Sequence, residues 1–167
     1  PFSRQSEREK IPVLIQQVLK EVIKMVLATI PANINISHHI DQDCGLVMAD
    51  PTQVHQIAMN LITNAYHAVD PANGNISIQL KEVVLESGTL AGRGIEAGPY
   101  ALLTVSDNGC GIAPDIMGKI FEPYFTTKEQ GKGTGIGLST VYGIVKEHGG
   151  DIQIYSELEK GTTFNIY

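Results

Sequence analysis

The sequence has 167 residues, of which 43% are hydrophobic and 18% are charged, a composition typical of one soluble globular domain with a real core. Its net charge is −6 at pH 7, its pI is about 5.3 and no run of Lys or Arg occurs, so nucleic acid and anionic membranes are not expected partners. No apolar run approaches the roughly 20 residues of a membrane span and no signal peptide is visible, so we expect a cytoplasmic domain without direct membrane contact.

The cysteines and histidines do not form clusters with metal-ligand spacing. Cys44 and Cys110 are far apart in sequence, which predicts two reduced thiols. The five histidines contain no His-x-x-x-His pair, and His38 and His39 are predicted to be surface residues of a strand. A metal site built from side-chain clusters alone is therefore not expected.

The first part of the chain predicts a helix followed by two short strands. Residues 1–10 are polar and resemble a linker or the end of a preceding element. Pro12 suits a first helical position, and an apolar stripe with helical spacing continues to about Ala28. Residues 34–39 alternate as a strand does, and Leu46 to Ala49 predict a second short strand after a turn.

The next helix carries an apolar stripe and a polar stripe. Asp50 is predicted as its N-cap and Pro51 as its first residue. The polar residues recur at intervals of three or four: Gln53, Gln56, Asn60, Asn64 and His67. Two interpretations stay open. The stripe is a solvated surface, or the amide oxygens of Asn60 and Asn64 are ligands for a phosphate-bound Mg²⁺.

The second part of the chain predicts four strands and one more helix. The expected strands are Asn75 to Glu86, Tyr100 to Ser106, Ile152 to Ser156 and Thr162 to Tyr167. A helix begins at about Leu138 and is ended by Gly149-Gly150. The strand from Tyr100 delivers the carboxylate of Asp107 onto a glycine-containing turn.

Two glycine clusters follow that carboxylate, at Gly109 to Gly111 and at Gly131 to Gly137. Glycines at a helix start let backbone amides surround an anion. A Walker loop is excluded because position 126 is Thr, and the dinucleotide fingerprint fails because Leu138 stands where its third glycine is needed. A carboxylate and an anion site together suit a ligand with a hydrogen-bond-donating base at one end and phosphates at the other.

Four motifs in order give a specific family resemblance over about residues 11–167. Asn60-Leu-Ile-Thr-Asn64-Ala resembles the N box of sensor histidine kinases, and Asp107-Asn-Gly-Cys-Gly111 resembles their first glycine box. Phe121-Glu-Pro-Tyr-Phe125-Thr-Thr-Lys128 resembles their F box, and Gly133-Thr-Gly-Ile-Gly137-Leu138 resembles the second glycine box. The resemblance implies the ATP-binding catalytic domain of the gyrase, heat-shock-chaperone, histidine-kinase and MutL superfamily. The expected fold is an α+β two-layer sandwich, a mixed sheet of about five strands with three main helices on one face.

The resemblance also assigns residue roles. Asp107 would accept a hydrogen bond from the adenine amine, Asn64 with Asn60 would hold Mg²⁺, and Lys128 or Lys132 would reach the γ-phosphate. The segment from about Ala113 to Gly133 would be a lid that is mobile without nucleotide. The positions expected to bind ATP are Asn60, Asn64, His67, Asp107, Gly109, Gly111, Ile112, Phe121, Phe125, Thr126, Lys128, Lys132, Gly133, Thr134, Gly135, Ile136, Gly137 and Leu138. Asn60, Asn64 and Lys128 are the expected catalytic residues.

The chain departs from the family pattern at three points. His67 stands where many relatives have Lys or Arg, and His55 stands where Glu is frequent. No histidine has the phosphoacceptor context, so the acceptor is expected on a dimerisation domain absent from this chain. Residues 1–10 would then be a linker or the end of the dimerisation helix, and residues 11–167 the catalytic domain of a longer kinase, anchored in a membrane or not. A response-regulator receiver domain is the further expected partner.

Two alternative functions stay open from the sequence. An anti-sigma-factor serine kinase shares the ATP fold, although the F-box motif argues against it. A non-catalytic nucleotide-sensing module would bind ATP without chemistry. A chaperone or topoisomerase ATPase is disfavoured, because no Glu occurs between Val54 and Val69 to activate water.

Overall fold

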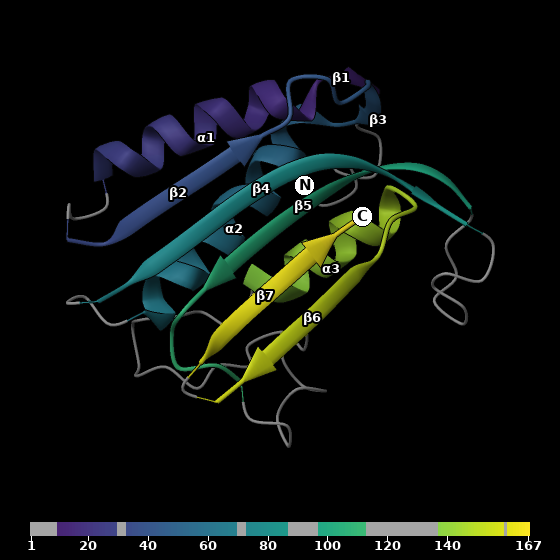
Figure 1. Cartoon of the computed structure of the whole chain (residues 1–167). Coiled ribbons are helices and arrows are strands. Elements are labelled where there is room, and N and C mark those ends of the chain that lie inside the picture. The colour runs from purple at the N-terminus through teal and green to yellow at the C-terminus, as the bar shows by residue number, and fades with distance from the viewer. Residues whose placement is uncertain (1–9, 30–32, 70–72, 87–96, 113–136, 159) are drawn as a thin grey trace, which may run out of the picture.

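The computed structural model describes residues 10–29, 33–69, 73–86, 97–112, 137–158 and 160–167. Its centre is a five-stranded mixed sheet in the order β2-β4-β5-β7-β6 (Figure 1). The strands are β2 (Asn35–Ile40), β4 (Asn75–Leu85), β5 (Gly98–Asp107), β6 (Ile152–Glu157) and β7 (Gly161–Ile166). β2 and β4 are parallel, and the other neighbouring pairs are antiparallel. β5 is therefore the central strand.

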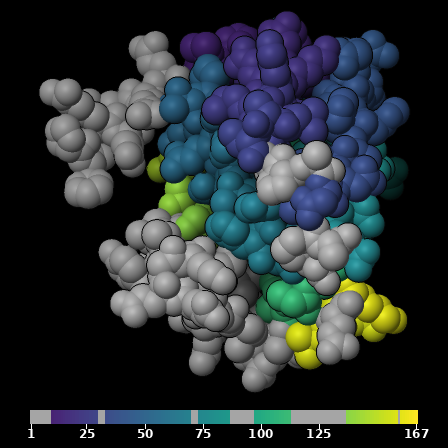
Figure 2. Space-filling model, turned by 90° about the vertical axis from the view of Figure 1, so that its left-hand side faces the viewer, coloured from purple at the N-terminus to yellow at the C-terminus, as the bar shows by residue number. Residues whose placement is uncertain are grey.

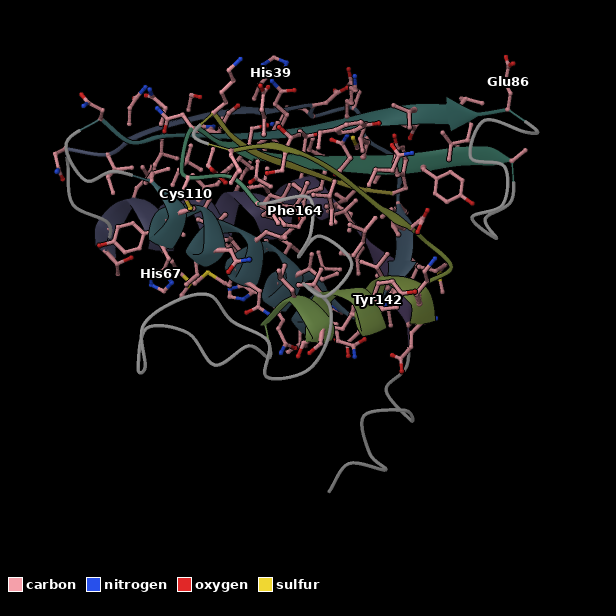
Figure 3. The ribbon with its side chains drawn as sticks, turned by 90° about the horizontal axis from the view of Figure 1, so that it is seen from below. His39, His67, Glu86, Cys110, Tyr142 and Phe164 are labelled. Atoms are coloured by element: carbon pink, nitrogen blue, oxygen red, sulfur yellow. The ribbon has the colours of Figure 1, made fainter. Side chains whose placement is uncertain are left out.

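In the described part of the chain, three helices cover one face of this sheet: α1 (Ile15–Thr29), α2 (Pro51–Ala68) and α3 (Gly137–Glu147). Figure 3 shows Phe164 between the sheet and the helices, whereas His39 lies on the opposite face. His38 and His39 are both exposed, as predicted. The arrangement confirms the predicted α+β two-layer sandwich with a mixed sheet.

The alternation of side chains along β4 explains why one face of the sheet is covered. Ile76, Ile78 and Leu80 point toward the helices and are at most 1% exposed. On the other face the neighbouring strands β5 and β7 are joined by polar side chains, as where Thr104 Oγ1 donates to Asn165 Oδ1 at 2.9 Å. The core therefore lies between the sheet and the helices.

The predicted start of the first helix at Pro12 is wrong. Pro12 lies in a strand, β1 (Ile11–Val13), which pairs antiparallel with β3 (Val47–Ala49) in a separate two-stranded sheet, and α1 begins only at Ile15. Proline's fixed φ and missing N–H fit a short strand at a sheet edge as well as a first helical turn. The partner strand decided the outcome, because β1 exists through its pairing with Val47–Ala49, and the β-branched Ile11 and Val13 are compatible with that pairing.

The predicted cap of α2 is confirmed. Asp50 has extended backbone angles, and its carboxylate accepts from the N–H of Thr52 at 2.9 Å, with Pro51 as the first helical residue. The described helices include none that is long and apolar enough to cross a lipid bilayer.

Candidate functional site

Asp107 ends the central strand β5 and lies opposite Ile76 of β4 and Thr162 of β7. Its Oδ1 accepts from the N–H of Gly109 at 2.9 Å, and the N–H of Thr162 also donates to the carboxylate. Burial raises the pKa of the Asp107 carboxyl, and these two backbone hydrogen bonds act in the opposite direction. The result is a half-buried acceptor held rigidly by its own strand and turn.

The glycines of the turn after β5 are required by close backbone contacts. A Cβ on Gly109 would lie 2.3 Å from the carbonyl oxygen of Ala68, at the end of α2. Gly111 has φ +75°, and a Cβ there would lie 2.2 Å from the carbonyl oxygen of Glu157. The N–H of Cys110 also donates to Ala68 O at 3.1 Å. The turn is thus fixed between α2 and the β6–β7 hairpin, and Figure 2 shows this green segment beside the yellow C-terminal residues.

Three polar residues around this turn were missed in the sequence analysis. Asn108 ties the turn to β4, because its Oδ1 accepts from the N–H of Asn75 at 2.8 Å. Ser156 Oγ accepts from the N–H of Ile112 at 2.7 Å, and the buried Thr162 lies beside Asp107. The hydroxyl residues of the last two strands were visible in the sequence, but only the strand pairing brings Thr162 to Asp107.

The polar stripe of α2 is not uniformly solvated. Asn60 and Asn64 are half-buried, whereas Gln56 and His67 are exposed. Asn60 Nδ2 donates to the carbonyl oxygen of Gly137, the first residue of α3, at 3.4 Å. Oδ1 is therefore the atom through which Asn60 can ligate a cation, and amide oxygens are chemically suited to Mg²⁺. In Figure 3, His67 lies near the C-terminal end of α2.

The structure thus brings two groups of predicted residues to α2. The turn of Asp107, Gly109 and Gly111 lies against its last residue, Ala68, and the start of α3 lies against Asn60. Ala68 and Asn60 are about 12 Å apart along the helix at 1.5 Å per residue. The predicted lid and much of the second glycine box lie outside the described residues; these positions are Phe121, Phe125, Thr126, Lys128, Lys132, Gly133, Thr134, Gly135 and Ile136.

Neither cysteine forms a disulfide, as predicted. Cys44 is buried, and its burial, followed by the charges of Asp41, Glu82 and Asp43, raises the pKa of its thiol. Cys110 is exposed in the turn after β5. Within the described part of the chain, no group of three or more His, Cys, Asp or Glu side chains could hold a metal ion.

Residues 49–167 match the family described as histidine kinase-, DNA gyrase B- and HSP90-like ATPases, and the chain belongs to this family. It is similar to the sensor kinase CckA of Brucella abortus, with 38% identity over 99% of this chain and 18% of that protein. It is also similar to the sensor histidine kinase ZraS of Salmonella typhimurium, with 42% identity over 72% of this chain and 23% of that protein. The chain thus spans about a fifth of these relatives.

Solved structures give the same result. The catalytic domain of histidine kinase ThkA superimposes with a TM-score of 0.75 and 28% identity, covering 95% of this chain and 94% of that chain. Full-length ShkA in complex with AMPPNP matches with a TM-score of 0.72 and 25% identity, over 94% of this chain and 30% of that chain. These findings confirm the predicted resemblance to the nucleotide-using catalytic domain of sensor histidine kinases.

Proposed function

We propose that this chain binds ATP with Mg²⁺ along α2 and transfers the γ-phosphoryl group to a histidine of a dimerisation domain. The observation that carries the proposal is the arrangement of two groups along the C-terminal half of α2. A rigid, half-buried carboxylate at Asp107 lies against one end, and Asn60 with the start of α3 lies about 12 Å away along the helix. That spacing suits a base at one end and phosphates at the other, and the similar ShkA structure contains AMPPNP.

The adenine end rests on the chemistry of Asp107. An ionised carboxylate only accepts hydrogen bonds, and adenine presents an exocyclic amine that donates one. Guanine presents a carbonyl oxygen at the corresponding position, which would leave two acceptors facing each other in a half-buried site. We therefore expect selection for adenine over guanine nucleotides.

The phosphate end rests on Asn60, Asn64 and the start of α3. Backbone N–H groups of Gly137 and Leu138 are in the first turn of α3, where an anion is stabilised by unpaired amides and the helix dipole. Asn64 and Asn60 are the Mg²⁺ ligands of the proposal, and bound Mg²⁺ neutralises phosphate charge.

Lid residues from the sequence complete the proposed phosphate site. Phe121 and Phe125 would anchor the lid, and Lys128 or Lys132 would contact the γ-phosphate. His67 replaces the basic residue expected three positions after Asn64, so its imidazole is the group that could approach the phosphates there.

Transfer works by positioning in this proposal, because α2 carries no carboxylate after its cap that could activate water. The nucleophile is supplied by the histidine of a dimerisation and phosphoacceptor domain, and a response-regulator receiver domain then takes the phosphoryl group. The relatives CckA and ZraS are named sensor kinases, which supports this choice of acceptor.

The deciding experiment is incubation with γ-labelled ATP, with and without a dimerisation domain from the parent kinase. We expect label on the acceptor only, labile to acid and stable to base, as a phosphoramidate is. The rate should be slow and rise with acceptor concentration, because no tether raises the effective concentration. Acid-stable label would favour a serine kinase, ATP binding without transfer would favour a nucleotide-sensing module, and label on this chain alone would contradict the assignment of its histidines.

A further inference from the structure

One imidazole joins the C-terminal end of α3 to the N-terminal end of α2. His148 Nε2 accepts from the backbone N–H of Asp50, the N-cap of α2, at 3.3 Å. Its Nδ1 lies 2.8 Å from the carbonyl oxygen of Ile144, one turn back in α3. A backbone N–H can only donate and a carbonyl can only accept, so these partners assign a neutral ring with its hydrogen on Nδ1.

A second contact joins the N-terminal end of α3 to the middle of α2. There Asn60 Nδ2 donates to Gly137 O at 3.4 Å. α2 and α3 are therefore antiparallel, and about 15 Å of α2 lies between these two contacts. Between the two contacts both helices carry buried apolar side chains, which favour contact between the helices but do not define their relative shift along the axis. They are Val54, Ile57, Ala58, Val141, Ile144 and Val145.

The C-terminal end of α3 is also fixed to the sheet. Gly149 has φ +74°, and the N–H of Gly150 donates to Val145 O at 3.0 Å, which closes the helix. A Cβ on Gly150 would lie 2.1 Å from the carbonyl oxygen of Tyr167, so this end lies directly against the last residue of the chain. The C-terminal end of α3 is thus held in place. The axial position of Gly137, at the other end of α3, therefore depends on how the C-terminal end contacts α2.

We propose that His148 is a positioning residue for the phosphate end of the site, acting through the axial register of α3 on α2. The hydrogen bond to Asp50 holds α3 at the register that places Gly137 opposite Asn60. This inference rests on the proposed function, in which the phosphates bind between the start of α3 and the stripe of α2. Asp107 belongs to the sheet and its own turn, so adenine recognition is independent of this register.

The test compares two amide variants of His148. H148Q has an oxygen that reaches as far as Nε2 and can accept from Asp50, whereas H148N reaches only as far as Nδ1 and keeps the contact with Ile144 O. Calorimetry with ATP and Mg²⁺ should give an affinity for H148Q within about twofold of the wild type. H148N should bind ATP about three- to tenfold more weakly, as expected from loss of one neutral hydrogen bond. Both variants should bind adenosine as the wild type does.

The adenosine comparison separates positioning from general loosening of the fold. If H148N binds ATP as tightly as the wild type, or loses adenosine and ATP affinity equally, the inference is overturned. If the wild type itself binds neither ligand, the proposed function fails instead. If H148N does not fold, H148M takes its place, because methionine removes both hydrogen bonds but keeps the bulk of the side chain. The affinities for ATP and adenosine are then compared in H148M in the same way.

Discussion

Replacing Asp107 with Asn tests the adenine end of the site with almost no change in shape. Asn keeps an oxygen that can accept from Gly109 N–H, but the charge is lost and an amide nitrogen takes one acceptor position. A hydrogen bond to a charged group contributes about 1.5–3 kcal/mol, so ATP and adenosine should bind roughly 10- to 100-fold more weakly. The preference for ATP over GTP should shrink by a similar factor.

Calorimetry with ATP, GTP and adenosine at pH 7.5 measures these changes. Glu157→Gln is the matched control, because that side chain is a nearby carboxylate that is 68% exposed and pairs with Lys160 at the surface. The control should bind all three ligands as the wild type does. Equal affinities of the wild type for ATP and GTP, or an unchanged affinity in D107N, would refute the role given to Asp107.

The same variant should have the opposite effect on the stability of the ligand-free fold. Burial raises the pKa of Asp107 in the folded state, so the folded protein binds this proton more tightly than the unfolded chain. The protonated Asp107 carboxyl therefore makes its full contribution to the stability of the fold below the unfolded pKa of about 3.9. This contribution is lost as the pH rises through the pKa of Asp107 in the folded state. D107N should therefore unfold at a higher temperature than the wild type at pH 7.5, and the difference should narrow toward pH 4. A lower unfolding temperature of D107N would mean that the hydrogen bonds from Gly109 and Thr162 N–H stabilise the ionised carboxylate by more than its burial destabilises it.

Three further predictions follow from single positions. Gly111→Ala should destabilise the fold by at least about 1–2 kcal/mol in urea titrations because of its positive φ, whereas Gly143→Ala, on the open face of α3 with nothing within 4 Å of the added Cβ, should be stabilising; equal effects would contradict the geometry. Asn64→Ala should remove the Mg²⁺ dependence of ATP binding and leave adenosine binding unchanged. An unchanged Mg²⁺ dependence would mean that Asn64 is not a Mg²⁺ ligand and would favour the interpretation of the polar stripe as a solvated surface. Cys110 should react with a maleimide much faster than Cys44, as read by mass spectrometry, and ATP should slow only the Cys110 reaction.

Most of the fold could be predicted because its signals are local. The alternation from Asn75 predicts a strand that the structure has as Asn75–Leu85, and Asp50-Pro51 predicts the exact start of α2. Pro12 shows the limit of such signals. Its ring is compatible with a helix start and with a strand edge, and the decision came from pairing with Met48, a residue that local patterns do not connect to it. Strand pairing is set by tertiary contacts, so β1 could not be predicted from the residues around it.

The candidate site also depends on strand pairing that local sequence patterns do not predict, and this affects which residue should be mutated to test it. The sequence located Asp107 and the two glycines after it, but the hydrogen bond from Thr162 depends on the β5–β7 register. Gly109 and Gly111 were expected to bind ATP, and the structure shows that the fold itself requires them, since added Cβ atoms would collide with Ala68 and Glu157. Replacing either glycine would disrupt the turn itself, so a loss of binding in such a variant could not be assigned to a lost ligand contact. Nucleotide recognition at this end therefore has to be tested at the Asp107 side chain, where charge can be removed while the backbone stays as it is.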